Sequence, residues 1–279
     1  MGKFAVYTIF DNNYIDNGFA LLYSFFKTNE WFDGDFFIIT DDKYSILSDE
    51  NKEKCKKFSS HIDFLEIKSD TFSLLMNNQK NICSEEKFLS CFYKLAVFLG
   101  KYDRVLWLDG DTLVLDNIRE LFESEEYNGK FCACLDCVAS NETFTKRSDR
   151  DYFNGGVYLV DKGFTNKYDF TRLYVFCSKV TKKELSSPRS RGKGNWVDQD
   201  CLNYYIKNED TLIIPSMTYN ANHCFGKGKG EMAKIFHYYG PFNKPNGKMD
   251  TRGKDKWFFD PWHKMHDEAM KIVNKNKEK

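Results

Sequence analysis

Short apolar segments alternate with helix-like segments along the first part of the chain. Residues 3–10, 35–41 and 62–67 are rich in aromatic and β-branched side chains, which is typical of strands. Apolar residues recur at helical spacing over residues 19–26, and a second helical stripe covers residues 86–100. This alternation predicts a parallel α/β sheet, in which ligands bind at the carboxyl ends of the strands.

An apolar strand at residues 104–108 is followed at once by two carboxylates, those of Asp109 and Asp111, with Gly110 between them. Two like charges at the end of a buried strand repel each other and lose hydration unless a positive charge lies between them. A divalent metal that carries a phosphate would resolve this conflict. A polar turn that joins two strands would account for the same residues, and taken alone they leave both interpretations open.

The second half places polar clusters beside apolar segments. Asn154 and Gly155 precede an apolar strand, where the glycines predict a bulge or a close approach of the backbone to a ligand. Residues 70–84 are polar and predict an irregular surface segment. Residues 181–195 are basic and rich in serine and glycine, which predicts a mobile loop or a lid over a phosphate-bearing ligand.

Two charged residues have ordinary interpretations. Lys94 lies off the apolar stripe of its predicted helix and would be a solvated lysine, whereas Asp198 opens a helix and is placed to cap it. His237 lies in an apolar segment, where a histidine is more often part of a core. An aromatic group that begins at Trp257 leads into a basic terminal helix, which we expect to pack on the domain.

Composition narrows the classes of function. The chain has 279 residues, enough for one large domain or two closely packed lobes, and 41 Lys and Arg balance 41 Asp and Glu. This balance gives no indication of a nucleic-acid partner. The sequence shows no transmembrane run or signal peptide, and its nine cysteines lie mostly in apolar segments, as reduced thiols do. We therefore expect a cytoplasmic protein, with a homodimer left open.

Five motifs occur in the order of a known family: DNNY at residues 11–14, LDGDTLVL at 108–115, FNGGV at 153–157, VDQD at 197–200 and HYYGPFNKP at 237–245. Together they resemble the family 8 glycosyltransferases, the group that includes glycogenin and bacterial lipopolysaccharide galactosyl- and glucosyltransferases. The resemblance covers residues 4–245. It implies the GT-A fold, a Rossmann-like α/β domain with a central, mostly parallel mixed sheet flanked by helices.

The resemblance also implies an activity and an organisation. A hexose, glucose first and galactose second, would pass from a UDP-sugar to a hydroxyl of a glycan or protein with retention, aided by Mn²⁺ or Mg²⁺. A nucleotide-sugar-binding module without transfer and a metal-dependent nucleotide-sugar pyrophosphatase are the alternatives. The transferase domain would span residues 1–249, with the nucleotide half at about 1–115 and the acceptor half at about 116–249. Residues 250–279 would form the aromatic anchor and the basic helix.

Roles follow from the resemblance residue by residue. Asp109 and Asp111, separated by Gly110, would hold the metal together with His237. The nucleotide would be held by Thr8, Asp11, Asn12 and Tyr14, the diphosphate by Gly240 and Lys244, and the donor sugar by Lys94, Asn154 and Gly155, while Asp198 and Gln199 would lie beside the anomeric carbon. The groups expected to take part in catalysis are Asp198, Gln199, Lys94 and Asn154.

The sequence departs from the family pattern at three positions. Gly110 stands where the family often has alanine, which we expect to loosen the turn slightly. Asp200 follows Gln199 as in the bacterial members, which favours an acceptor other than the enzyme's own tyrosine. One extra residue separates Lys244 from His237. For retention, same-face attack is favoured over a double displacement, for which Asp198 is the obvious nucleophile.

Overall fold

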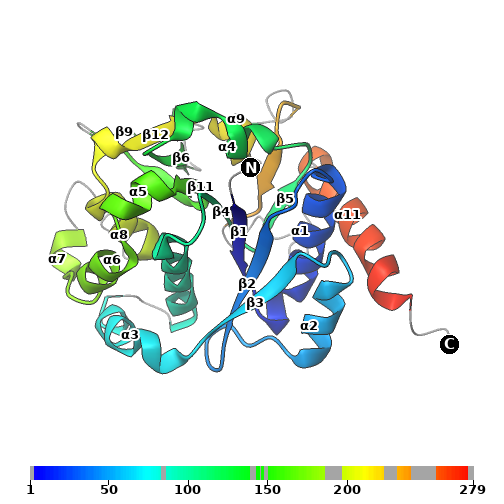
Figure 1. The fold of residues 1–279 in the computed structure, drawn as a ribbon, viewed down its shortest axis with the longest axis horizontal. Helices are drawn as coiled ribbons and strands as arrows, with labels where there is room; N and C mark the ends of the chain where they lie inside the picture. The colour runs from blue at the N-terminus through cyan, green and yellow to red at the C-terminus, as the bar shows by residue number, and fades with distance from the viewer. Residues whose placement is uncertain are drawn as a thin grey trace.

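The computed structural model describes residues 3–82, 86–138, 143–144, 146–147, 150–185, 197–222, 231–239 and 256–275. A central sheet lies between two groups of helices (Figure 1). The strands are β1 (Phe4–Ile9), β2 (Asp35–Asp41), β3 (Ile62–Ile67), β4 (Arg104–Leu108), β5 (Thr112–Val114), β6 (Phe131–Leu135), β7 (Cys137–Val138), β8 (Thr143–Phe144), β9 (Lys146–Arg147), β10 (Arg150–Asp151), β11 (Phe153–Asp161), β12 (Thr211–Ile214) and β13 (Ile235–His237).

The α-helices are α1 (Ile15–Thr28), α2 (Asp49–Lys56), α3 (Ser73–Lys80), α4 (Arg119–Glu123), α5 (Lys162–Lys167), α6 (Phe170–Cys177), α7 (Lys182–Leu185), α8 (Val197–Tyr205), α9 (Ser216–Tyr219) and α11 (Lys256–Asn274). The 3₁₀ helices are η1 (Asn12–Tyr14), η2 (Ser69–Phe72), η3 (Glu86–Leu99), η4 (Glu125–Tyr127) and η5 (Asn208–Asp210).

The main sheet has seven strands in the order β12-β6-β11-β4-β1-β2-β3. Strands β4, β1, β2 and β3 run parallel to one another, and β12 runs parallel to β6. Strand β11 is antiparallel to both of its neighbours. The predicted mixed, mostly parallel sheet is therefore confirmed, with β2 and β3 at the predicted residues.

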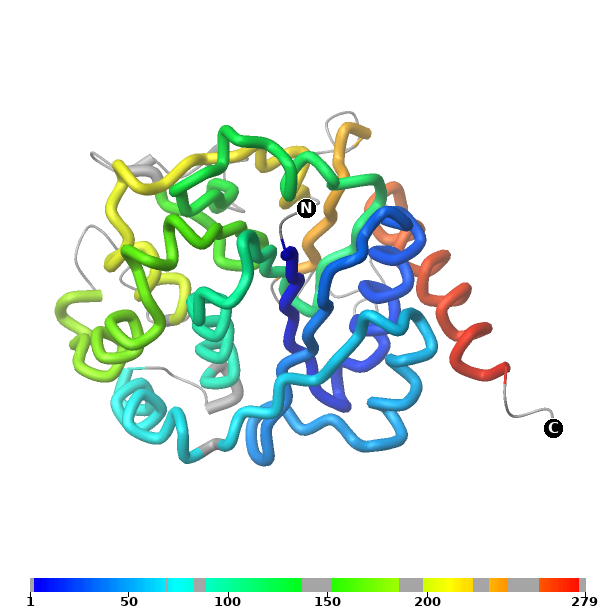
Figure 2. Tube along the Cα trace, in the orientation of Figure 1, coloured from blue at the N-terminus to red at the C-terminus, as the bar shows by residue number. Residues whose placement is uncertain are grey.

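Helices cover both faces of this sheet. Helices α1, α2 and α11 lie on one side, and α3, α5, α6 and α8 lie on the other (Figure 1). Side chains of β1 enter the hydrophobic core on each face of the sheet. Ala5 and Tyr7 pack on the side of η3, whereas Val6 packs beneath α1. The C-terminal helix runs beside α1 (Figure 2), where Lys27 Nζ meets Glu268 Oε2 at 2.6 Å.

Two predicted segments differ in the structure. Of the predicted irregular segment 70–84, the structure describes residues 70–82, where η2 and α3 form and bury Phe72, Leu75 and Met76. The helix predicted at residues 86–100 is a 3₁₀ helix, η3, and Gly100 follows it with a φ of 68°. Residues 92–98 are all buried, so a single apolar stripe does not describe this helix, and the solvated face predicted for Lys94 is absent.

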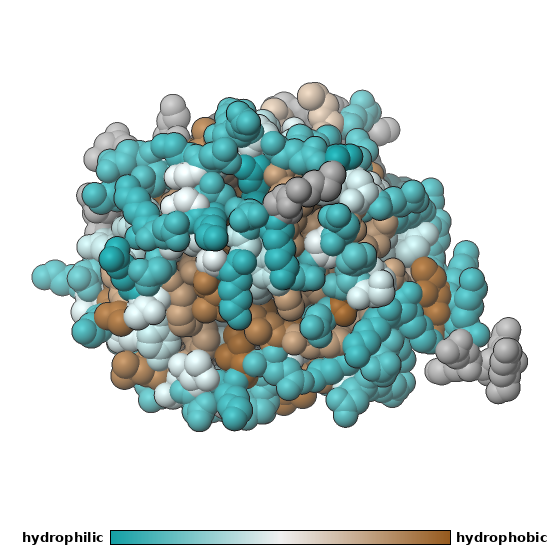
Figure 3. Space-filling view, in the orientation of Figure 1, coloured by the Kyte–Doolittle hydropathy of each residue, from teal (hydrophilic) through white to brown (hydrophobic). Residues whose placement is uncertain are grey.

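The surface shown in Figure 3 is mostly hydrophilic, with apolar side chains gathered in the middle of this face, over the edge strand β3. None of the described helices combines the length and the apolar character needed to cross a bilayer.

Candidate active site

The Asp-Gly-Asp turn joins β4 to β5 at the carboxyl end of β4. The Asp109 amide donates to the Gly156 carbonyl at 2.8 Å, and the Thr112 amide donates to the Asp109 carbonyl at 3.0 Å. Register places the end of β1 beside this turn, since Tyr7 pairs with Trp107. The two polar turns predicted to share one sheet edge, at residues 11–14 and 109–111, therefore do so.

The expectation that Gly110 loosens the turn slightly is wrong, because the turn is tightly packed at this residue. A Cβ at this residue would lie 2.4 Å from the Ile9 carbonyl oxygen, and a backbone atom cannot move aside cheaply. The turn therefore packs directly on the end of β1, and only a residue without a side chain fits it in this arrangement.

Gly110→Ala should therefore displace the turn that carries both carboxylates. We expect a loss of about 1–3 kcal/mol in the free energy of unfolding, the usual range for overpacking, together with weaker Mn²⁺ binding. Thermal denaturation and calorimetric titration with Mn²⁺ measure the two effects. An alanine variant with native stability and native Mn²⁺ affinity would contradict this close packing.

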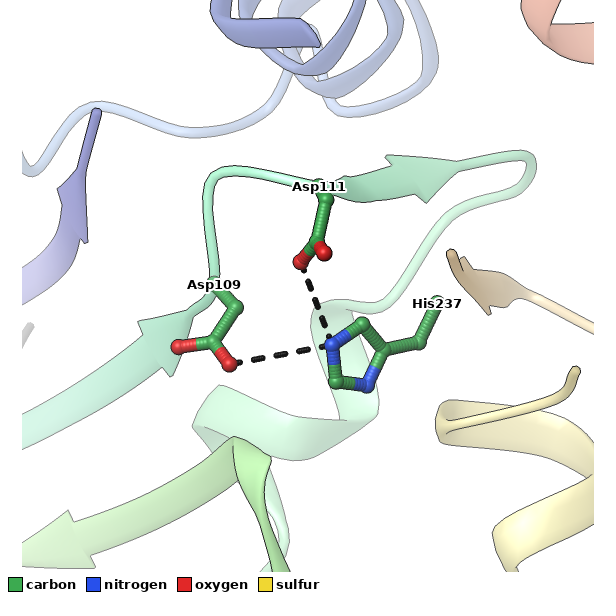
Figure 4. A group of neighbouring side chains, drawn as sticks. All are labelled: Asp109, Asp111 and His237. Atoms are coloured by element: carbon green, nitrogen blue, oxygen red, sulfur yellow. Dashed lines mark ion pairs between the residues drawn. The ribbon is translucent and has the colours of Figure 1, made fainter. Parts of the chain in front are cut away.

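His237 reaches the two carboxylates because β13 pairs antiparallel with β5, which sets His237 opposite Thr112. Its Nε2 lies 3.2 Å from Asp111 Oδ1 and 3.7 Å from Asp109 Oδ2. Figure 4 shows both carboxylates pointing toward the imidazole. The imidazole is buried, whereas both aspartates are partly exposed, so the cluster is open to solvent on the side of the carboxylates.

Which imidazole nitrogen carries the proton determines whether this cluster can bind a cation. Nδ1 lies 2.8 Å from the Asn220 amide oxygen, which can only accept a hydrogen bond. Nδ1 therefore carries the proton, and in the neutral ring the lone pair is on Nε2. Nε2 is buried and has no hydrogen-bond partner among the described residues. A lone pair that faces two carboxylates is unfavourable unless a cation lies among them.

Two carboxylates and one imidazole are common ligands of a divalent metal ion, so the donor set fits such an ion. One ligand atom from each of the three residues lies within 4.8 Å of the other two. Among the described residues this is the single group of three or more such ligands within metal-binding reach.

Lys94 is a central residue of the site and not a solvated lysine, since only 2% of it is exposed. Its ammonium contacts Asp198 Oδ2 at 2.6 Å and Asp109 Oδ1 at 3.5 Å, and donates to the Gly155 carbonyl at 3.1 Å. Burial by itself lowers the pKa of Lys94, but the carboxylates of Asp109 and Asp198 outweigh it and raise that pKa well above its ordinary value. Lys94 is therefore held as a cation between Asp109 and Asp198 of α8.

Asp198 and Gln199 lie in the first turn of α8, which begins at Val197. The capping interpretation of Asp198 is thus wrong: its carboxylate pairs with Lys94 instead. Gln199 Oε1 accepts from the Gly155 amide at 2.7 Å. Both side chains are at least nine-tenths buried.

A bulge in β11 links these groups to the metal ligands. Its register with β6 shifts between Phe153 and Tyr158, so the predicted bulge at the glycines is present, inside the strand. Asn154 Oδ1 accepts from the Gly156 amide at 2.8 Å. Gly155 contacts Lys94 and Gln199, and the Gly156 carbonyl accepts from Asp109.

The predicted nucleotide residues are close in sequence but differ in their surroundings. Asp11 accepts from the amides of Asn13 and Tyr14, both at 3.0 Å, and so shapes its own turn. Asn12 Oδ1 accepts from the Ser48 amide at 3.0 Å, which ties the turn to the segment before α2. Tyr14 is 43% exposed, as a residue that stacks on a base must be.

Thr8 is fully buried, and its hydroxyl has no hydrogen-bond partner in the described ranges. By alternation along β1 it shares the face of Val6, beneath α1. Its role with the uridine stays a prediction. Gly240 and Lys244, and residues 186–195 of the basic segment, lie outside the described residues.

Three residues that contact Asp109 or His237 were not predicted from the sequence. Trp107 Nε1 donates to Asp109 Oδ1 at 2.7 Å. Asn220 bonds His237 from behind, and Gly156 lies against the imidazole, since a Cβ there would be 2.0 Å from His237 Cε1. The Asn-Gly-Gly motif was a signal for Gly156, whereas the local sequence around Asn220 resembles an ordinary helix end.

Fold and site together define a GT-A glycosyltransferase. The solved structure of galactosyltransferase LgtC, in complex with donor and acceptor sugar analogs, superposes with a TM-score of 0.64 at 18% identity and covers 95% of each chain. A model of the family described as Glycosyl transferase family 8 matches residues 5–245. The chain belongs to this family, as its motifs predicted.

Two curated relatives extend the comparison. "Uncharacterized protein R707" of Acanthamoeba polyphaga mimivirus is 25% identical over 99% of this chain and 96% of its own length. "Inositol phosphorylceramide glucuronosyltransferase 1" of Arabidopsis thaliana is 29% identical over 53% of this chain, but the match covers 28% of that protein.

Proposed function

We propose that this protein is a metal-dependent retaining hexosyltransferase that uses a UDP-sugar, with glucose as the first candidate and galactose as the second. The acceptor would be a hydroxyl of a glycan or protein. The observation that carries the proposal is the direct contact between two sets of groups: the Asp109–Asp111–His237 cluster and the buried pair of Lys94 and Asp198. A metal-diphosphate site beside a buried polar site is the arrangement that sugar transfer needs.

Each group has a proposed role. Asp109, Asp111 and His237 would hold Mn²⁺ or Mg²⁺, which when bound supplies positive charge against the diphosphate leaving group. Lys94, Asn154 and Gly155 would contact the donor sugar. These buried groups are held by one another in advance, so that they need little reorganisation when charge develops.

Same-face attack remains the favoured route to retention. The Asp198 carboxylate is paired with the Lys94 ammonium at 2.6 Å, and such pairing makes a carboxylate a weaker nucleophile. Gln199 is held through Oε1 by the Gly155 amide and is suited to orient a sugar hydroxyl. The acceptor proton would then pass to an oxygen of the departing UDP.

One experiment separates this function from its alternatives. The protein is incubated with Mn²⁺, a panel of UDP-sugars and sugar acceptors, and the nucleotide products are identified, with a chelator as control. Transfer or slow donor hydrolysis gives UDP. A pyrophosphatase would instead release UMP and a sugar phosphate, and a binding module would leave the donor intact.

Charge around the sugar side favours a neutral hexose. Asp136 and Asp200 are each 2% exposed and lie beside Asn154 and Tyr152. The cation that the described residues offer here, Lys94, is already engaged by Asp198. A uronate would bring its carboxylate near those of Asp198, Asp136 and Asp200, and like charges at close range are costly.

UDP-glucose should therefore exceed UDP-glucuronate in kcat/KM by about tenfold or more. The comparison matters because one relative is named a glucuronosyltransferase. Initial rates of UDP release with each donor, at equal Mn²⁺ and acceptor, give the ratio. Equal or faster turnover of UDP-glucuronate would contradict the neutral-donor assignment while leaving the transferase proposal in place.

A further inference from the structure

Asn220 lies behind the imidazole of His237, on the side away from the carboxylates. Its amide oxygen is 2.8 Å from His237 Nδ1, and the residue is 3% exposed. The backbone brings it there because Asn220 ends α9 and the next residue pairs with β13: the His237 amide donates to the Ala221 carbonyl at 2.8 Å, and the Ala221 amide donates to the Ile235 carbonyl at 3.0 Å.

This contact determines which imidazole nitrogen carries the proton. It therefore determines whether Nε2, which faces the carboxylates, has a free lone pair. An amide oxygen cannot donate, so the bond requires a proton on Nδ1. Nε2 is then left as an acceptor, and within the part of the chain that the structure describes it has no hydrogen-bond partner although it is buried. In the other neutral tautomer, Nε2 would carry the proton toward Asp111 and could not bind a metal, and two lone pairs would face each other at Asn220.

We propose that Asn220 is a positioning residue that fixes the tautomer and the orientation of His237 and thereby sets the affinity of the site for a divalent cation. The proposal rests on the metal site of the proposed function. It adds a residue from the acceptor half of the chain, which no motif of the family resemblance contains. Polar groups behind a metal-bound histidine typically change metal affinity by about 10- to 100-fold when they are replaced.

Two substitutions at this position test the proposal by direct Mn²⁺ binding. Asn220→Leu has a similar size but offers no acceptor, and Asn220→Asp keeps an acceptor for Nδ1. By calorimetric titration of each intact protein with Mn²⁺ alone, we expect the leucine variant to bind about 10- to 100-fold more weakly than the native protein. The aspartate variant should bind at least as tightly as the native protein.

A matched control separates positioning from general loss of structure. Asn29 is also buried, with 1% exposed, and its side chain accepts from the Ile118 amide at 3.0 Å away from the metal ligands. Asn29→Leu should lower the melting temperature without changing the Mn²⁺ affinity of the folded protein. The melting temperature of every variant is measured with and without Mn²⁺, because the ion stabilises only a protein that binds it.

The outcomes are distinct. Native Mn²⁺ affinity in Asn220→Leu overturns the proposal, and so does an equal loss in the leucine and aspartate variants, which would indicate a purely structural role. Absence of Mn²⁺ binding in the native protein overturns it as well. Sugar transfer is read separately, from UDP release: a protein that binds Mn²⁺ in the expected order but transfers no sugar refutes the proposed function and leaves the role of Asn220 intact.

Discussion

Replacing Asp111 with asparagine is expected to lower kcat/KM for UDP-sugar transfer by about 100-fold or more while the protein stays folded. The amide has the shape of the carboxylate but lacks its charge, so the cluster with Asp109 and His237 would lose the affinity that holds a divalent cation. Removing one of two neighbouring like charges also relieves repulsion in the metal-free protein. Turnover at saturating Mn²⁺, Mn²⁺ calorimetry and thermal denaturation measure the three quantities.

Asp109→Asn should have the same effect on Mn²⁺ binding. It would also remove a negative charge that lies 3.5 Å from the Lys94 ammonium. Asp116→Asn provides the matched control, because Asp116 is exposed and its carboxylate accepts only the local Asn117 amide among the bonds described for it. The control should keep native activity. Native turnover and Mn²⁺ affinity in Asp111→Asn would refute the assignment of the metal ligands.

Local periodicity was sufficient to predict much of the sheet. Strands β2 and β3 occupy the predicted residues because their apolar segments are short, are bounded by polar turns and pack on both faces. The prediction failed at α3, where an eight-residue helix with three buried residues, Leu75, Met76 and Gln79, lies within an otherwise polar segment. Such a short amphipathic helix is stabilised by its tertiary packing, which local sequence does not show.

The candidate site illustrates the same limit with charged residues. Lys94 and Asp198 each had an ordinary local interpretation, as a solvated lysine and a helix cap. In the structure they form a buried pair because η3 and α8 meet at the bulge in β11. Only the resemblance to the family indicated that these residues belong to one site; their own surroundings in the sequence did not.

The sequence indicated where glycines have a structural role, but not how closely each one packs against its neighbours. The Asn-Gly-Gly motif indicated a bulge or a close approach of the backbone to a ligand; the register shift of a bulge is present, and Gly156 packs against the His237 imidazole. Gly110 was expected to be a slightly loose turn residue, yet it contacts the end of β1 so closely that a Cβ does not fit. The distance between a glycine and its neighbour depends on how two distant strands pack, and so it requires the structure.

Gly156→Ala is expected to have the second large effect, because this glycine supports both kinds of metal ligand. Its carbonyl accepts from the Asp109 amide at 2.8 Å, and a Cβ would lie 2.0 Å from His237 Cε1 and 2.6 Å from its Nδ1. The imidazole would have to leave its place between Asn220 and the carboxylates. We expect Mn²⁺ affinity and kcat/KM each to fall by about 100-fold, with a loss of about 1–3 kcal/mol in stability.

Gly155→Ala is the matched control for metal binding, since its Cβ would lie 3.5 Å from the nearest atoms of Gln199 and Lys94, an ordinary van der Waals distance. This neighbour should retain Mn²⁺ affinity within a few-fold, whatever it does to sugar transfer. Mn²⁺ calorimetry on the two alanine variants gives the comparison directly. Equal affinities in both would mean that His237 does not need the space above Gly156, and the imidazole would then have another position from which it binds the metal.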